Sequence, residues 1–295
     1  MNIQSIKYLA ALQKYAHFGK AAKICCVSQP TLSMQIKKLE DFLGVHLVDR
    51  DSKPIQLTEI GTRIAEHAQN ILREMDAMRE AAQAAKDPYS GQIKLGVIPT
   101  VAPYLLPLIF PQLKHIFSQL TYFLVEAQTH NLVEELQQGK LDAAILALPV
   151  TATHLTEYHF FNEEFLLAAP SGHPWSKRKT VKSEHLAGQH LFLLNDGHCL
   201  REQALAVCQQ VNAKEAENFR ATSLETLRHM VAAGSGLTLM PRLACRKGDG
   251  LVYIPFSDVK PSRNLGLVWR TTTGRALLCN KLGRTLQTLL QRLSG

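Results

Sequence analysis

Two cysteines, Cys199 and Cys208, stand nine residues apart in the sequence. A cysteine thiolate can attack a peroxide oxygen and become a sulfenic acid, and a second thiol can then convert the sulfenic acid into a disulfide. The pair therefore has the residue types of a redox switch. The alternative is that both are ordinary buried cysteines, because no fixed redox motif has this separation and burial is the commonest fate of a free cysteine.

The neighbours of Cys199 favour its thiolate form. His198 is adjacent, Arg201 follows two residues later, and Asn195 or Asp196 is placed to cap a helix that begins here. A nearby cation and the positive end of a helix dipole both stabilise a thiolate. The sequence therefore favours attack by Cys199 on peroxide, and the nearest second thiol is nine residues away.

Geometry adds a condition to this chemistry. If residues 199–208 form one helix, the two Cα atoms lie about 13 Å apart along its axis and on opposite faces. A disulfide needs Cα atoms within about 7 Å of each other. The bond then forms only if the segment unwinds, so that oxidation is coupled to refolding, as a switch requires.

The composition is that of a folded chain with room for two or three domains: 295 residues, 46% hydrophobic and 20% charged. No apolar run approaches the ~20 residues that span a bilayer. We therefore expect a cytoplasmic protein with no membrane contact. The formal net charge of +8 is compatible with a polyanionic partner.

Six cysteines are too few for a structural disulfide framework, and cytosolic glutathione keeps thiols reduced, so any disulfide is regulatory or catalytic. Cys25 and Cys26 are expected to pack inside the N-terminal module, and the roles of Cys245 and Cys279 stay open. The sequence shows no His/Cys/Asp cluster with metal-ligand spacing, and the Gly-containing segment 231–236 lacks a phosphate-loop lysine. We expect neither a metal nor another cofactor.

The first sixty residues carry the pattern of a helix-turn-helix module. Apolar spacing predicts helices over residues 2–15, 17–24 and 29–43, and Ser28 is placed to cap the third. This third helix turns an apolar stripe inward and leaves short polar and basic residues on its other face. Side chains of this kind read base edges and phosphates in a DNA major groove. The candidate DNA-binding residues are Ser28, Gln29, Pro30, Thr31, Ser33, Gln35, Lys37 and Lys38.

Two short strands over residues 45–50 and 55–58 predict a wing, on which Arg50 and Lys53 can contact phosphate. The alternative for this whole surface is a solvated helix face. Residues 1–63 hold nine Lys or Arg against five Asp or Glu, so one module is only modestly basic. Binding of double-stranded DNA then needs a dimer to collect enough phosphate contacts.

A long amphipathic helix over residues 59–86, capped by Thr58, follows the module, and residues 87–91 form a linker after it. Its apolar residues recur at alternating spacings of four and three, the heptad pattern of a seam between two helices. They are Leu57, Gly61, Ile64, Ala68, Ile71, Met75, Met78 and Ala82. The alternative is a helix that lies on its own domain, but the alanines and methionines favour a dimer seam.

Strands and helices alternate in the second half, with strands over residues 92–98, 122–126 and 143–148 and helices between them. This order predicts βαβ units and a mostly parallel sheet. A second unit over residues 165–255, with residues 266–270 returning to the first unit, would leave a cleft between two subdomains. Such a cleft is the usual place for a ligand.

The N-terminal motifs resemble those of LysR-type transcriptional regulators, through Phe18-Gly19-Lys20-Ala21-Ala22, residues 27–33 and 36–40, and Leu57-Thr58. The resemblance implies an α/β chain: an N-terminal winged helix-turn-helix, a long linker helix, and a regulatory domain of two subdomains similar to periplasmic binding proteins. It also implies a homotetramer built as a dimer of dimers. The expected domains are 1–58 for DNA binding, 59–90 for the linker, dimerisation helix and hinge, and 91–295 for redox sensing, with subdomain I at about 91–163 and 267–295 and subdomain II at about 164–266.

The segments 196–201 and 219–236 resemble the peroxide-sensing members of the same family. This resemblance implies that Cys199 is the peroxidatic cysteine, that Cys208 is the resolving cysteine, and that their disulfide is the activated state that recruits RNA polymerase to promoters. His198 and Arg201 would tune or stabilise the sulfur. A glutaredoxin- or glutathione-type reductant would reset the switch.

Thr100 and Thr129 match positions that help to hold hydrogen peroxide in that family, and the alternative for each is a helix cap. Two other functions stay open: a regulator that binds a small organic effector in the cleft, with incidental cysteines, and a thiol peroxidase on a DNA-binding scaffold. We expect no enzyme, because catalysis alone gives the DNA-binding module no purpose.

Overall fold

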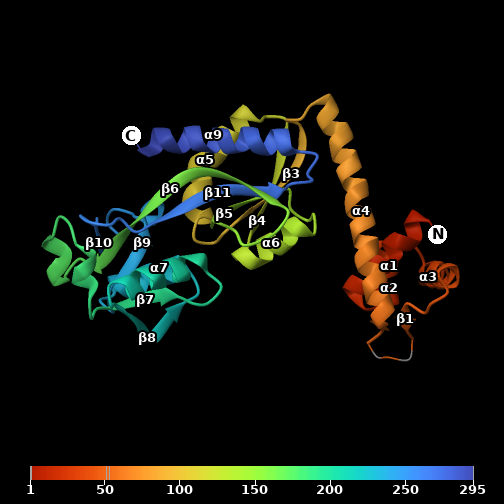
Figure 1. The fold of residues 1–295 in the computed structure, drawn as a ribbon, viewed down its shortest axis with the longest axis horizontal. Helices are drawn as coiled ribbons and strands as arrows, with labels where there is room; N and C mark the ends of the chain where they lie inside the picture. Colours follow the sequence, from red (N-terminus) through yellow and green to blue (C-terminus); the bar gives the residue numbers. More distant parts are fainter. Residues whose placement is uncertain (1, 51, 53, 295) are drawn as a thin grey trace. The chain divides into compact units, whose positions relative to one another are not determined.

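The computed structural model describes residues 2–50, 52 and 54–294, and it divides into two compact units, Met1–Ala82 and Gln83–Gly295 (Figure 1). Every helix within the described ranges is too short or too polar to cross a bilayer.

The N-terminal unit is a winged helix-turn-helix, as the sequence predicts. Its elements are α1 (Ile3–Tyr15), α2 (Phe18–Ile24), α3 (Gln29–Leu43), β1 (Val48–Asp49), β2 (Gln56–Leu57) and most of α4 (Glu59–Lys86), whose last residues belong to the larger unit. Ser28 caps α3 by accepting from the Thr31 N–H, and Thr58 caps α4 by accepting from the Gly61 N–H at 2.9 Å. β1 and β2 pair antiparallel as the wing, over fewer residues than the pattern suggests.

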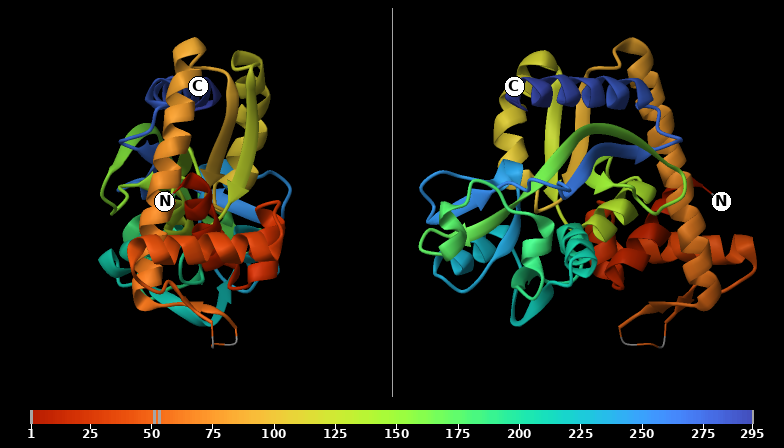
Figure 2. Two further views of the ribbon diagram at one scale, coloured as in Figure 1. Left: turned by 90° about the vertical axis from the view of Figure 1, so that its right-hand side faces the viewer. Right: turned by 60° about the vertical axis from the view of Figure 1, so that its left-hand side comes forward.

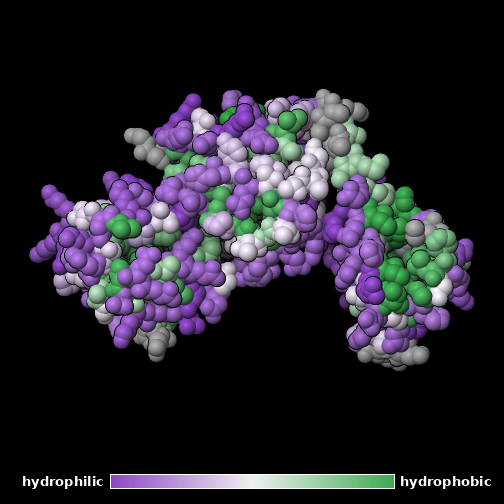
Figure 3. Space-filling view, viewed as in Figure 1, coloured by the Kyte–Doolittle hydropathy of each residue, from purple (hydrophilic) through white to green (hydrophobic). Residues whose placement is uncertain are grey.

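The apolar stripe of α4 is buried in the N-terminal unit near the start of the helix and is exposed farther along. Near its start, Gly61 and Ala68 are buried within the N-terminal unit itself, and a Cβ on Gly61 would lie 2.0 Å from the Leu47 carbonyl oxygen. Farther along, Ile71 is 41% exposed and Met78 is 72% exposed. Figure 3 shows hydrophobic residues on the face of this unit along which α4 runs. The helix therefore lies partly on its own domain, and only the later positions of the predicted seam are available to a second helix.

The larger unit contains a mixed sheet, so the expectation of a mostly parallel sheet is wrong. Strands β3 (Gly91–Val97), β4 (Leu120–Glu126) and β5 (Ala143–Leu148) pair parallel. The long strands β6 (Leu155–Pro170) and β11 (Ser262–Arg270) run antiparallel to their neighbours, as do β9 (Thr238–Pro241) and β10 (Leu251–Ile254). The difference arises because β6 and β11 return across the sheet directly, without a crossover helix.

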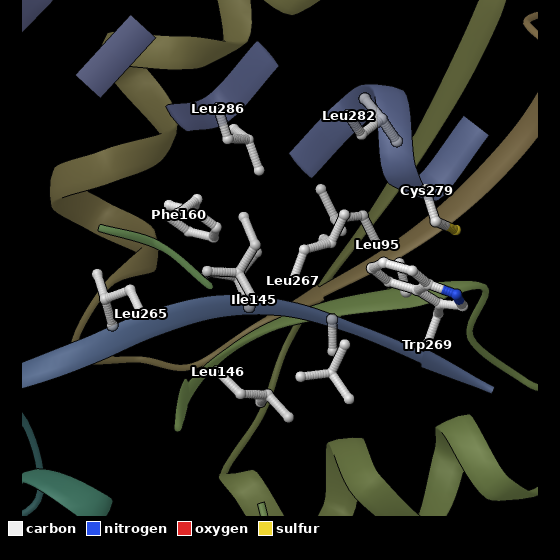
Figure 4. Close-up of a cluster of buried hydrophobic side chains, with 14 of the residues drawn as sticks. Leu95, Ile145, Leu146, Phe160, Leu265, Leu267, Trp269, Cys279, Leu282 and Leu286 are labelled. Carbon is white, nitrogen blue, oxygen red and sulfur yellow. The ribbon is translucent and has the colours of Figure 1, made fainter. Parts of the chain in front are cut away.

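One hydrophobic core forms around the parallel strands. Helices α5 (Ala102–Ile116) and α9 (Ala276–Ser294) lie on one face of the sheet, and α6 (Thr129–Gln137) lies on the other (Figures 1 and 2). Figure 4 shows Leu282 and Leu286 of α9 above Leu267 of β11 and Ile145 of β5. We call this cluster the first core.

A second core forms around residues 165–256. It includes the parallel pair β7 (His190–Leu194) and β8 (Lys214–Ala221), helices α7 (Cys199–Gln210) and α8 (Leu224–Ala232), and strands β9 and β10. Because β6 contributes to both cores, it ties them together in one unit.

The packing of α9 on β6 generates a prediction. An ideal Cβ on Gly283 would lie 2.6 Å from the ring of Tyr158. Gly283→Ala should therefore lower the free energy of unfolding by about 1–3 kcal/mol through overpacking, although alanine is the better helix former. Urea unfolding measures the change. Gly172→Ala, where no atom lies within 4 Å of the added Cβ, is the control, and equal stability of the two variants would contradict the packing.

Candidate functional site

The two threonines lie at one edge of the sheet because parallel strands end there together. Val97, the last residue of β3, pairs with Glu126, the last residue of β4. Thr100 and Thr129 each follow three residues later. Neither serves as the N-cap of the helix that follows, since Val101 occupies that position in α5 and Gln128 occupies it in α6, each without a side-chain capping hydrogen bond.

Cys199 is the first residue of α7, and its half-buried side chain packs against the first core. The preceding loop lies close to the start of α6. Gly197 has φ of +89°, and a Cβ there would lie 2.7 Å from Gln128 Oε1. The left-handed conformation is what favours glycine here, because the end of the flexible Gln128 side chain can move away from an added Cβ.

The expectation that Asn195 or Asp196 caps α7 is wrong. His198 occupies the N-cap position without a side-chain hydrogen bond, and neither Asn195 nor Asp196 caps α7. Asp196 instead accepts a hydrogen bond from Arg201 Nε at 2.9 Å.

The surroundings of the sulfur have opposing effects on the pKa of the Cys199 thiol. Burial raises the pKa of the Cys199 thiol, and the Arg263 guanidinium, the Thr129 hydroxyl and the Leu200 N–H lower it, but burial prevails. The predicted thiolate-favouring environment is therefore only partly present: the helix N-terminus contributes, and the resting thiol still has a raised pKa.

Arg263 is a residue of the site that no sequence pattern singles out. It comes from the start of β11, donates from Nη1 to Thr100 Oγ1 at 2.9 Å, and pairs with Glu163 at 2.7 Å. Arg263 therefore contacts Thr100 and also acts electrostatically on the Cys199 thiol. The sequence offered one signal, a charged residue opening an apolar strand, but nothing in the spacing connects position 263 with position 199.

Arg201 does not face the sulfur. Its guanidinium makes a bidentate contact with Glu215 of β8, at 2.5 and 2.8 Å, and also donates to the Leu194 carbonyl oxygen. Arg220 shares the Glu215 carboxylate at 2.9 Å. The charge expected to tune Cys199 is thus compensated by acids, and it fastens α7 to β8.

His198 is also not a cation beside the sulfur at neutral pH. Burial lowers the pKa of its imidazole, and the hydrogen bond with the Thr222 backbone only partly opposes this. A neutral ring can donate or accept a hydrogen bond, but it adds no positive charge.

Cys208 lies in the same helix as Cys199 but in the other core. Leu200, Ala204 and Cys208 form the stripe of α7 that is buried in the second core. Because the two positions are nine residue steps apart on the helix, their Cα atoms are separated by about 13 Å along its axis and half a turn around it. Both thiols are free, and burial, then the Glu215 charge, raise the pKa of Cys208.

Unpartnered polar atoms lie in and next to this helix. Thr129 Oγ1 and the amide oxygens of Gln203 and Asn195 are buried and accept no hydrogen bond from the described residues. Gln203 stands one turn after Cys199, so their side chains share a face of α7. Buried polar atoms of this kind are suited to a small polar ligand.

A cavity of about 1150 Å³ lies elsewhere in the unit. Its walls come from residues between 173 and 237, and include Lys214, Arg220 and Gly236. All belong to the part of the chain expected to form subdomain II. This cavity is therefore not the predicted cleft between subdomains.

On the N-terminal unit, six candidate DNA-binding residues are exposed: Ser28, Gln29, Pro30, Lys37, Lys38 and Arg50. The other candidates Thr31, Ser33 and Gln35 are partly buried, and Lys53 lies outside the described residues.

Two details of the N-terminal unit differ from simple expectations. Arg50 pairs with Glu40 at 3.3 Å, so part of its charge is compensated. The expected packing of both adjacent cysteines inside the module is wrong for Cys26. It is exposed because α2 ends here in a left-handed turn, with φ of 55° at Cys26.

A helix-turn-helix unit joined to an α/β regulatory unit defines a DNA-binding transcriptional regulator. The family "Bacterial regulatory helix-turn-helix protein, lysR family" matches residues 3–62, and the "LysR substrate binding domain" family matches residues 86–291. The chain belongs to the LysR family.

Among its relatives is the "Hydrogen peroxide-inducible genes activator" of Escherichia coli O157:H7, 49% identical over 92% of this chain and 90% of that protein. Full-length OxyR C199D from Pseudomonas aeruginosa is similar in structure, with a TM-score of 0.77 and 36% identity over 97% of this chain and 98% of the other. The oxidized form of OxyR has a TM-score of 0.64 and 47% identity over 70% of this chain and 98% of the other.

The Arg201–Glu215 contact generates a prediction about pH. The hydrogen bond from Arg201 holds the pKa of Glu215 below its ordinary value of 4.5. The pair therefore stabilises the folded state above pH about 4.5, and this contribution is lost as the pH falls through the lowered value. Glu215→Gln should cost about 2 kcal/mol at pH 7 and much less near pH 3, as measured by urea unfolding at both values.

Glu184→Gln is the matched control, because Glu184 pairs with Lys182 while 69% exposed and should contribute little. A cost of Glu215→Gln that is the same at both pH values would show that the carboxylate charge is not what holds α7 to β8.

Proposed function

We propose that the chain is a hydrogen-peroxide-sensing transcriptional activator, switched on by a reversible disulfide between Cys199 and Cys208. The observation that carries the proposal is the division of two free thiols on one helix between two cores. The relative from Escherichia coli, named for hydrogen peroxide-inducible genes, and the oxidized form of OxyR support it.

The proposed seat of the peroxide is the space beside Cys199. The hydroxyl oxygen of Thr129 and the amide oxygen of Gln203 accept no hydrogen bond from the described residues, so each can accept one from hydrogen peroxide. Thr100 Oγ1 already accepts from Arg263 Nη1, so its own O–H can donate a hydrogen bond to a peroxide oxygen.

The proposed chemistry has two steps. The Cys199 thiolate attacks one peroxide oxygen, the O–O bond breaks, and the departing hydroxide takes a proton to become water, which leaves a sulfenic acid. The Cys208 thiolate then attacks the sulfenic sulfur, the S–O bond breaks, and protonation of the oxygen releases a second water. The two cysteines lose two electrons, which the peroxide gains. A glutaredoxin- or glutathione-type reductant returns them.

The second step requires α7 to unfold, because a helical span of about 13 Å cannot be closed by a disulfide. Cys208 must leave the second core, and the Arg201–Glu215 contact is strained or broken as the helix start moves. We infer that the new packing of residues 199–210 changes the surface of the regulatory unit, and hence its assembly as a dimer of dimers.

The N-terminal unit is the proposed reader of double-stranded DNA at promoters, with the exposed residues of α3 in the major groove and Arg50 near phosphate. The exposed later part of α4 is the proposed dimer seam. Recruitment of RNA polymerase and a cytoplasmic location belong to the same proposal, since both the chromosome and the thiol reductants are found there.

A sensor differs from a thiol peroxidase in turnover. Both consume one peroxide for each reduction of the disulfide. Because the oxidised helix has to refold before the thiols can react again, we expect the sensor to react about once and then wait for reduction, without many rapid turnovers. The protein is thus proposed to act as a regulator and not as an enzyme.

The direct test is disulfide mapping after one equivalent of hydrogen peroxide. The reduced full-length protein is exposed for seconds, quenched by alkylation and analysed by peptide mass spectrometry. We expect a peptide that joins Cys199 and Cys208, a sulfenic acid on Cys199 in Cys208→Ser, and no oxidation at this site in Cys199→Ser.

Cys245→Ser is the control, because that thiol donates to the Pro241 carbonyl oxygen and lies outside the proposed reaction. It should leave the disulfide unchanged. Two free alkylated thiols in the unmodified chain would refute peroxide sensing and favour a small effector instead.

DNA reading generates a separate prediction. Lys37→Ala should weaken binding to promoter DNA and reduce the slope of log affinity against log salt by about one, because one phosphate contact is lost. Lys140→Ala, an exposed lysine of the regulatory unit, is the control. A slope that Lys37→Ala leaves unchanged in a salt titration would remove Lys37 from the interface.

A further inference from the structure

A buried ion pair contains the arginine that acts electrostatically on the Cys199 thiol, and the other member of the pair has no part in the chemistry proposed above. Arg263 and Glu163 are both fully buried, with Arg263 Nη2 at 2.7 Å from Glu163 Oε2. Arg263 Nε also donates to Oε2 at 2.7 Å, so the contact is bidentate from the side of the guanidinium. A pair this well formed fixes the plane of the arginine.

The other contacts of the pair aim the guanidinium at the site. Nη1 donates to Thr100 Oγ1 at 2.9 Å and Nη2 donates to the Thr100 carbonyl oxygen at 3.1 Å. Glu163 is itself held, because Oε1 accepts from the Leu243 N–H at 2.8 Å. The Leu243 N–H therefore holds Glu163, and Glu163 holds Arg263. Arg263 in turn contacts Thr100, which is proposed to bind peroxide.

The same pair determines the charge near the sulfur. After burial, the Arg263 guanidinium is the strongest influence on the pKa of Cys199 and lowers it, whereas the Glu202 carboxylate of α7 raises it. In a buried environment an unpaired arginine would act on the thiol with its full charge, and a carboxylate in contact with the arginine cancels much of that field.

We propose, on the basis of the proposed role of Cys199, that Glu163 is a positioning residue that holds Arg263 on Thr100 and limits the stabilisation of the Cys199 thiolate by the guanidinium. Glu163 thus sets how reactive the resting sulfur is. Arg263 still stabilises the thiolate as it forms, but the Glu163 carboxylate weakens this stabilisation.

The test is the pH dependence of alkylation of Cys199 by iodoacetamide in the reduced full-length protein, followed by mass spectrometry of the Cys199 peptide. Glu163→Gln should move the midpoint to lower pH, and a midpoint lower by about one on the pH scale means about tenfold more thiolate at any pH below it. Glu163→Asp retains the negative charge and should restore a midpoint near that of the parent protein. A midpoint that is unchanged or higher in Glu163→Gln would overturn the proposal.

A second variant keeps the proposal open to disproof if Glu163→Gln leaves too little folded protein. The double variant Glu163→Gln/Arg263→Gln carries no unpaired buried charge. It also removes the cation, so its midpoint should lie above that of the parent protein. A midpoint at or below the parent value would overturn the proposal. Alkylation does not use peroxide, so these results stand even if disulfide mapping refutes peroxide sensing.

Discussion

The packing of α7 between two hydrophobic cores is the constraint on which the proposed switch depends. Cys199 packs against the first core, whereas Cys208 belongs to the apolar stripe that α7 buries in the second. Hydrophobic burial and the Arg201–Glu215 contact both hold the helix in this arrangement. A disulfide cannot form without giving up part of this packing, so the covalent bond and the fold of residues 199–210 exclude each other.

Charge around the sulfur comes from a distant part of the chain. Arg201, the arginine nearest to Cys199 in sequence, is turned to Glu215, and the distant Arg263 supplies the cation that lowers the pKa of the thiol. Burial outweighs it, so the resting sulfur is mainly a protonated thiol at neutral pH. The hydroxyl oxygen of Thr129, which accepts no hydrogen bond from the described residues, then marks where hydrogen peroxide is proposed to meet the sulfur.

Sequence patterns predicted what depends on local spacing and missed what depends on the path of the chain. Ser28 and Thr58 cap the helices as expected, because a cap is set by residues within one turn. Thr100 and Thr129 were found through a resemblance. The antiparallel return of β11, the link from Arg263 to Thr100, and the turning of Arg201 to Glu215 are contacts across long separations, and no periodicity encodes them.

Amide hydrogen exchange over residues 199–210 tests the central claim most directly, because it reports the fold of α7 in each redox state. We predict strong protection of these amides in the reduced protein, and loss of most of it when hydrogen peroxide has joined Cys199 to Cys208, with protection regained on reduction. A disulfide that forms while the amides of α7 stay as protected as before would contradict the account.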